Sequence, residues 1–206
     1  MKVLLINGSP KDNGCTYTAL SVAEKILKEE GIETQIYHIG KKPVYGCIAC
    51  KACVETQACI FKDDSANEII GLLKKADGLI VGSPVHFAGA CGTLCALLDR
   101  VFYQRSHLYS YKPAAALVCC RREGGGSAFD RLNKYFTYAQ MPVVTSHYWN
   151  VIHGMTPEDV LKDEEGLQII RALARNMAYQ LKGMALSASS NPAPAQEARV
   201  RTNFIR

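Results

Sequence analysis

The sequence predicts an α/β fold, a doubly wound parallel sheet of five strands in the order 2-1-3-4-5 with helices on both faces. Short apolar runs between turn residues alternate with stretches in which apolar residues recur every three or four positions. Such alternation is typical of a parallel sheet covered on both faces. A loop rich in Gly, Ser and Thr follows the first run, and this favours an order that places ligand loops where the connections diverge.

Five apolar runs are expected to form the strands, each of them short and bounded by turn residues. They occupy residues 3–6, 34–39, 78–83, 114–120 and 143–148. The fourth run is apolar throughout, which suits a strand buried on both faces of a parallel sheet. The second is expected to lie at the edge of the sheet.

Helices are expected between these runs, where the apolar residues share one helical face. They fall within residues 19–28, 65–76, 91–102, 127–139 and 164–181. Ser65 and Glu68 are expected to form a capping box for the second helix. Thr156 and Pro157 predict a further helix start, and residues 124–126 are expected to be a loop.

Length and composition bound the class of protein. At 206 residues the chain is expected to form one domain at residues 1–186, with a flexible C-terminal tail at 187–206 whose Phe204 and Ile205 hint at docking. No apolar run approaches the roughly 20 residues of a membrane span, and the apolar stretch at residues 3–6 is too short for a signal peptide. We therefore expect a cytoplasmic protein without a membrane partner. The net charge of +5 is modest and does not indicate nucleic-acid binding by the domain.

The loop at residues 7–18 is expected to bind a phosphate, because the amides and the positive dipole at a helix N-terminus favour an anion. The nucleotide-triphosphate and dinucleotide glycine patterns are both absent. Hydroxyls and amides suit a compact phosphate monoester, as in FMN. The candidate ligands are Ser9, Lys11, Cys15, Thr16, Tyr17 and Thr18. The alternative is that the hydroxyls only cap the helix.

Two further loops are expected to reach the flavin. The loop after the third strand is apolar and aromatic, as a flat isoalloxazine ring requires, and contributes Pro84, Val85, His86 and Phe87. His86 is either a proton donor or a residue that stacks or faces solvent. The loop after the fourth strand contributes Arg121 and Gly125, near the ring edge where charge develops on reduction.

Residues 46–60 form a cysteine-rich loop with the sharpest chemical signal in the chain. Cys47, Cys50, Cys53 and Cys59 follow the spacing C-x2-C-x2-C-x5-C, and four thiolates this close can hold one [4Fe–4S] cluster. Zinc, or no metal at all, are the alternatives. The loop leaves the end of the second strand, so cluster and flavin are expected on one face of the molecule. Because that strand is an edge strand, the cluster can lie nearer to a partner subunit's flavin than to its own.

Several motifs spread over nearly the whole chain resemble those of the iron–sulfur flavoproteins in the flavodoxin-like NADPH-dependent FMN reductase superfamily. The matching pieces are residues 8–10 with Gly14 and Thr16, the cysteine loop with residues 62–64, and residues 82–85, 99–100, 148–150, 163–166 and 202–206. The resemblance implies FMN in the loops described above and a homodimer or homotetramer with flavin at the interface. The chain departs from the family pattern at Cys15, usually Asn, and at His86, usually Tyr.

The expected function is that of an FMN-dependent oxidoreductase, in which the cofactors carry the chemistry and no side chain is catalytic. Electrons would pass from NAD(P)H or a ferredoxin-like partner to FMN, and from there singly through the cluster, or directly to a quinone, a flavin or oxygen. The alternatives are a flavodoxin-like electron carrier without a substrate of its own, or a protein whose cysteine loop holds zinc or no metal.

Overall fold

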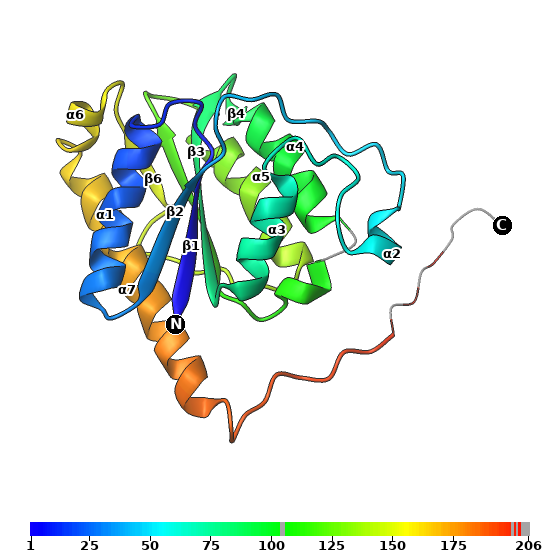
Figure 1. Cartoon of the computed structure of the whole chain (residues 1–206). Coiled ribbons are helices and arrows are strands. Elements are labelled where there is room, and N and C mark those ends of the chain that lie inside the picture. Colours follow the sequence, from blue (N-terminus) through cyan, green and yellow to red (C-terminus); the bar gives the residue numbers. More distant parts are fainter. Residues whose placement is uncertain (104–105, 199, 201, 203–206) are drawn as a thin grey trace.

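A parallel sheet in the order β2-β1-β3-β5-β6 forms the centre of the computed structural model, which describes residues 1–103, 106–198, 200 and 202. The short strand β4 pairs antiparallel with β3 (Figure 1). The strands are β1 (Lys2–Asn7), β2 (Glu33–His38), β3 (Gly78–His86), β4 (Gly89–Ala90), β5 (Ala114–Cys120) and β6 (Val151–His153). Apart from this hairpin, the predicted five-stranded doubly wound topology is confirmed.

Helices cover both faces of the sheet. One face packs against α3 (Ala66–Lys75), α4 (Gly92–Phe102) and α5 (Gly125–Tyr138), and the other against α1 (Cys15–Glu29) and α7 (Glu164–Ser187). Alternate residues of β1 enter the two cores: Leu4 and Ile6 face α3, whereas Val3 and Leu5 face α1. This period of two is the expected geometry of a strand buried on both faces. The remaining short helices are α2 (Cys53–Thr56), η1 (Ser106–Tyr109) and α6 (Pro157–Val160).

The expected fifth strand at residues 143–148 is wrong, because the chain meets the sheet edge in two separate places. Val143 pairs with Ala114 in a single bridge, and regular pairing resumes only at Val151, opposite Val118. Between these two contacts β5 advances by four positions and the other segment by eight, so most of the latter stays outside the ladder. The side-chain amide of Asn150 donates to the Ala116 carbonyl at 3.1 Å and replaces part of the missing ladder.

The loop expected at residues 84–90 is instead a β-hairpin. β3 runs to His86, and Val85 pairs with Ala90 across a turn at Phe87 and Ala88, whose φ angles are 49° and 57°. Two successive positive φ angles are typical of the tight turns that match the twist of a hairpin. The base of the hairpin is held by the Ser83 hydroxyl, which accepts from the Cys91 amide at 3.0 Å.

Three expected helix boundaries also differ. The capping box at Ser65 does not form: Asp64 accepts from the Ala66 amide, while the Ser65 hydroxyl donates to the Ile39 carbonyl. α5 begins at Gly125, within the expected glycine loop, and α7 continues to Ser187. The start at Thr156 is confirmed, with a capping box completed by Asp159.

No helix in the described part of the chain is both long and apolar enough to cross a membrane. The expected docking pair, Phe204 and Ile205, lies outside the described residues. The flexibility of residues 187–206 therefore stays a prediction.

Candidate functional site

Two regions carry the candidate chemistry: the loops at the carboxyl edge of the sheet, and the cysteine-rich segment that leaves this edge after β2 (Figure 1). In a doubly wound sheet the carboxyl edge is where ligands bind. Here three connections meet at it, after β1, after β3 and after β5.

The loop after β1 has a backbone that is held from several sides. The Gly8 amide donates to the Gly82 carbonyl of β3 at 2.9 Å, and the Ser9 amide donates to the Asn7 side chain at 3.1 Å. His38, at the end of β2, places its Nε2 2.8 Å from the Ser9 carbonyl. A Cβ at Gly8 would lie 2.4 Å from a Leu94 methyl carbon, so the loop sits directly against α4.

The loop ends at the N-terminus of α1, which no side chain caps. The first amides of a helix have no intrahelical acceptor, so those of α1 are available to a ligand. The Thr16 hydroxyl is buried and, among the described residues, has no hydrogen-bond partner of normal geometry. It approaches the buried Cys119 sulfur, which is only a weak acceptor. An uncapped helix end with an orphaned hydroxyl fits a bound phosphate.

The other predicted phosphate ligands differ in their burial and in whether their side chains already have hydrogen-bond partners. Ser9 is buried, and its hydroxyl accepts from the Lys11 amide at 3.1 Å. The Thr18 hydroxyl donates to the Gly14 carbonyl at 3.2 Å, within its own helix. Cys15 is half-buried, and burial raises the pKa of its thiol. Lys11 and Tyr17 are exposed. The anion cradle is therefore mainly backbone and Thr16, with fewer side-chain donors than the sequence predicted.

Four of the predicted flavin-ring residues belong to the β3–β4 hairpin, and the other two follow β5. Pro84 and Val85 are half-buried, whereas His86 and Phe87 are exposed, Phe87 completely. Arg121 is exposed in the turn after β5, and Gly125 is buried at the first position of α5. This helix start also has no side-chain cap.

Gly124, the residue immediately before α5, packs against the β3–β4 hairpin. Its φ of 89° lies in the left-handed region, and a Cβ there would be 2.5 Å from Ala88 Cα and 2.9 Å from a Val85 methyl. The turn after β5 therefore packs against the hairpin at a distance that only glycine allows. This contact sets the spacing between two of the three ligand loops.

The four predicted metal ligands line one common pocket. Cys47, Cys50, Cys53 and Cys59 surround it, together with Phe61 and two residues from the C-terminal end of α4, Arg100 and Tyr103. Its volume is about 20 Å³, room for about one water molecule. Among the described residues, no three possible ligands lie close enough to hold a single metal ion. The four cysteines that line the pocket are a set of donors that both an iron–sulfur cluster and a tetrahedral zinc ion accept.

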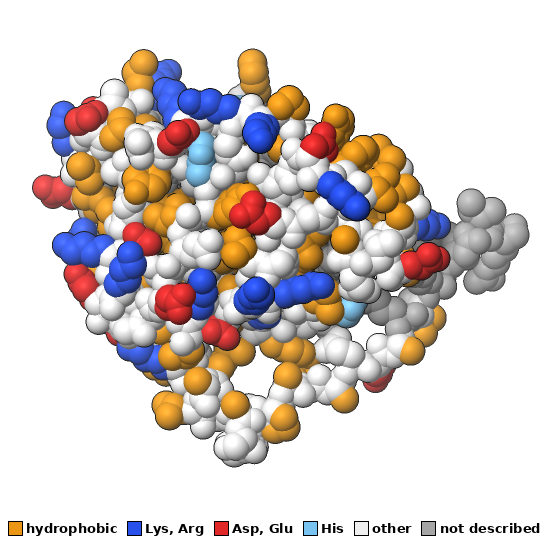
Figure 2. Space-filling model, viewed as in Figure 1, with side chains coloured by type: hydrophobic (Ala, Val, Ile, Leu, Met, Phe, Trp, Pro, Cys, Tyr) orange, Lys and Arg blue, Asp and Glu red, His pale blue; other side chains and the backbone are white. Residues whose placement is uncertain are grey.

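The backbone around these cysteines is irregular. Ala49, Lys51 and Gln57 have φ angles of 53°, 61° and 56°, a left-handed conformation that is uncommon outside glycine. Alternation of left- and right-handed residues turns amide groups toward a common centre, as at many phosphate and iron–sulfur sites. The segment also exposes apolar side chains, Ile48, Val54 and Ile60 among them, and Figure 2 shows such side chains gathered on the flank where it lies.

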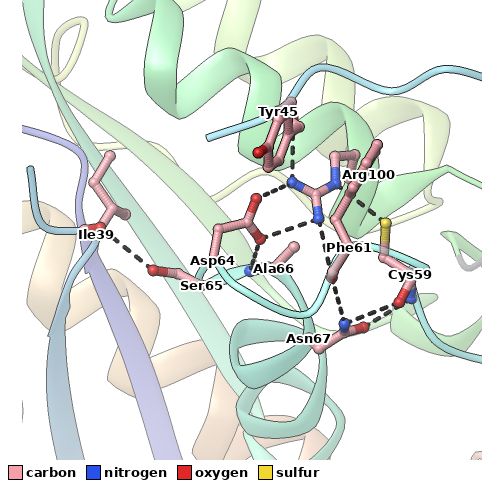
Figure 3. A network of polar contacts seen from close by, with 9 residues as sticks. All are labelled: Ile39, Tyr45, Cys59, Phe61, Asp64, Ser65, Ala66, Asn67 and Arg100. Atoms are coloured by element: carbon pink, nitrogen blue, oxygen red, sulfur yellow. Dashed lines mark hydrogen bonds and ion pairs between the residues drawn. The ribbon is translucent and has the colours of Figure 1, made fainter. Parts of the chain in front are cut away.

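A buried network that the sequence analysis missed anchors this segment (Figure 3). Both members of the Arg100–Asp64 ion pair have side chains only 1% exposed. Burial alone would raise the pKa of Asp64, but the hydrogen bonds from Arg100 and from the Ala66 amide, together with the positive charge of Arg100, hold that pKa below its ordinary value. Asn67 fixes Cys59 by accepting from its amide at 2.7 Å and donating to its carbonyl at 3.0 Å. Asp64 and Arg100 are 36 positions apart, so no short-range pattern could pair them. The available signal was the presence of two charged residues, Asp99 and Arg100, within the otherwise apolar stretch 97–102.

The expectation that cluster and flavin share one face is not met within a single chain. The segment starts at the carboxyl edge but runs along the outside of α3 and α4, and its pocket meets the end of α4 remote from that edge (Figure 1).

Fold and site together define a flavodoxin-like protein. Residues 1–156 match the family model of NADPH-dependent FMN reductases, and the chain belongs to this family. An iron–sulfur flavoprotein of Methanocaldococcus jannaschii is 35% identical over 190 residues, covering 88% of this chain and 98% of the relative. An iron–sulfur flavoprotein of Methanosarcina thermophila is 31% identical over 157 residues, which is 75% of each chain. The resemblance inferred from the motifs is confirmed.

Solved structures agree on the fold. The RosB structure with bound 8-demethyl-8-formylriboflavin-5'-phosphate superposes with a TM-score of 0.70 at 14% identity, covering 100% of this chain and 94% of RosB. FerB of Paracoccus denitrificans, a flavoenzyme NAD(P)H:(acceptor) oxidoreductase, has a TM-score of 0.66 at 14% identity, covering 88% of this chain and 97% of FerB.

Gly124→Ala is expected to destabilise the protein by at least about 1 kcal/mol, because the left-handed conformation disfavours alanine and its Cβ overlaps Ala88. Urea unfolding followed by circular dichroism measures the effect. The control is Gly126→Ala, where a Cβ meets nothing within 4 Å; its stability should be unchanged or slightly higher. Equal stability of the two variants would contradict the packing role of Gly124.

Proposed function

We propose that this protein is an FMN-dependent oxidoreductase that moves electrons between NAD(P)H, or a ferredoxin-like donor, and a quinone, a flavin or oxygen, either directly from the flavin or singly through a [4Fe–4S] cluster. The observation that carries the proposal is the presence in one chain of two sites, an uncapped helix end with an orphaned hydroxyl and a pocket lined by four cysteines. Membership of the FMN reductase family supports FMN, and the names of the relatives support the cluster.

Each part of the chain has a defined task in this proposal. FMN, when bound, supplies both hydride and single-electron chemistry. The amides at the start of α1 and the Thr16 hydroxyl bind its phosphate, while the β3–β4 hairpin and the turn at Gly124 orient its ring. The four cysteines hold the cluster. No side chain is assigned a catalytic role, because the protein's contribution is binding and orientation.

We further propose that the protein works as a homodimer or homotetramer in the cytoplasm. Phe87, Tyr148, Trp149 and Met155, in loops around the ligand edge and the edge strand, are each more than half exposed. Large exposed apolar side chains often mark contact surfaces. An oligomer would also bring the cysteine pocket of one subunit toward the FMN of another, a route supported by the outward path of the cysteine segment.

Thr16→Val is expected to affect stability and FMN binding in opposite directions. Without FMN, removal of a buried unpaired hydroxyl should leave the protein as stable or more stable. Affinity for FMN should fall roughly tenfold or more, since a hydrogen bond to a charged group contributes about 1.5–3 kcal/mol. Fluorescence titration of the FMN-free protein measures the affinity. Ser21→Ala removes another unpaired buried hydroxyl of α1, beyond its first turn, and should bind FMN normally; weaker binding by both variants would contradict a specific role for Thr16.

Protein purified without oxygen is expected to contain one FMN and about four iron and four sulfide per chain. Cys53→Ser should lose the iron and retain FMN, because Cys53 lines the cluster pocket. The control is Cys95→Ser, a half-buried cysteine of α4 outside that pocket, which should retain both. Iron and sulfide assays with the visible spectrum measure the content. Zinc in place of iron would overturn the cluster, and absence of flavin would overturn the whole proposal.

NADH or NADPH is expected to be consumed in steady state when a quinone is supplied. Cys53→Ser should retain this two-electron reaction but lose transfer to a one-electron acceptor such as cytochrome c, because only the cluster route is removed. Absorbance changes of the nicotinamide and of cytochrome c measure the two rates. Lack of nicotinamide oxidation, together with flavin reduction by reduced ferredoxin, would favour the electron carrier.

A further inference from the structure

Arg100 approaches a cysteine sulfur directly. It lies in the last turn of α4, is 2% exposed, and places its Nε–H donor 3.2 Å from the Cys59 Sγ. Among the described residues it is the one arginine that lines the four-cysteine pocket. This contact distinguishes Cys59 from the other three predicted ligands.

Other contacts fix the orientation of the guanidinium. Its two terminal nitrogens donate to the Asp64 carboxylate, one of them at 3.0 Å, and to the Tyr45 and Phe61 carbonyls at 3.2 and 3.4 Å (Figure 3). The Phe61 ring lies 5.1 Å from the guanidinium carbon and stacks on Tyr45 with ring centres 4.6 Å apart. With both terminal nitrogens engaged, Nε is held toward the sulfur.

The sulfur is held as firmly as the donor. Asn67 binds both backbone groups of Cys59 and also donates to the Phe61 carbonyl at 2.9 Å. Cys59 is thus attached through Asn67 to α3 and through Arg100 to α4. By contrast, Cys47 and Cys50 are exposed. Within the described part of the chain, no side chain donates a hydrogen bond to either of their sulfurs.

We propose that Arg100 is a positioning residue of the iron–sulfur centre, which donates a hydrogen bond to the Cys59 sulfur and raises the reduction potential of the bound cluster. The inference rests on the proposed function, because it requires the cluster to be present. Reduction adds one negative charge to a centre already surrounded by thiolates. A fixed positive charge and an N–H···S hydrogen bond both stabilise that form, and both are known determinants of cluster potential.

Potentiometric titration of the cluster in the whole protein tests the proposal, with the FMN of the same sample as an internal reference. Arg100→Gln, which removes charge and donor geometry, should give a more negative cluster potential than wild type. Arg100→Lys, which keeps the charge but loses the forked donor, should lie between them. The FMN potential should not change. Arg131→Gln is the matched control, since Arg131 pairs with Asp99 and Tyr135 away from the pocket, and should behave as wild type.

A second measurement needs no change at Arg100. Wild-type protein labelled with ¹⁵N in its arginine side chains should show hyperfine coupling of a guanidinium nitrogen to the reduced cluster in pulsed electron paramagnetic resonance. The coupling should persist in labelled Arg105→Lys protein, whose substituted residue lies outside the described residues. Its absence from wild type, or its loss in Arg105→Lys, would overturn the assignment even if the Arg100 variants do not fold.

The outcomes separate this inference from the proposed function. A loaded Arg100→Gln protein with the wild-type cluster potential would overturn the inference alone. The same holds if the variant contains less iron but the remaining cluster keeps its potential, because Arg100 would then be only structural. Wild-type protein that takes up no iron and sulfide would overturn the cluster proposal itself.

Discussion

The buried ion pair between Arg100 and Asp64 is the contact on which the cysteine-rich segment depends. Two charges removed from water are costly unless hydrogen bonds satisfy them, and breaking such a pair costs about 3–5 kcal/mol. Here the pair is satisfied by the Tyr45 and Phe61 carbonyls, which flank the segment, and by the Ala66 amide at the start of α3. The segment has little regular structure, only the single turn α2, so this attachment to α4 determines where its cysteines lie.

The two candidate sites are built in different ways, and each suits its expected ligand. The anion cradle is mostly backbone: an uncapped helix end, a loop held by Asn7 and His38, and one orphaned hydroxyl. The cysteine pocket is built from side chains on an irregular segment that Arg100 contacts at both ends, through Tyr45 and through Cys59. A compact phosphate is recognised by converging amides, whereas a cluster requires four thiolates from different directions.

Much of the fold was predictable because its determinants are local. The apolar runs and helical faces identified four of the five main strands, and the cysteine spacing identified four residues that do line one pocket. The errors arose where distant groups compete with local preference. Ser65 was expected to cap α3, yet its hydroxyl donates to the Ile39 carbonyl, and the preceding residue, Asp64, accepts from the first amide of the helix. The run 143–148 has strand character, but the register required by β5 leaves most of it unpaired.

The sequence by itself determined the fold class, the strand order, the phosphate-type loop and the group of four cysteines, since each rests on residue types at short spacing. Only the tertiary structure decided which groups remain free for a ligand and which satisfy one another. The Thr18 hydroxyl is engaged within its helix while that of Thr16 is left unpaired. Arg100 reaches Cys59 and Asp64 from a different helix. Such pairings depend on burial and on the packing of distant segments, which no local pattern records.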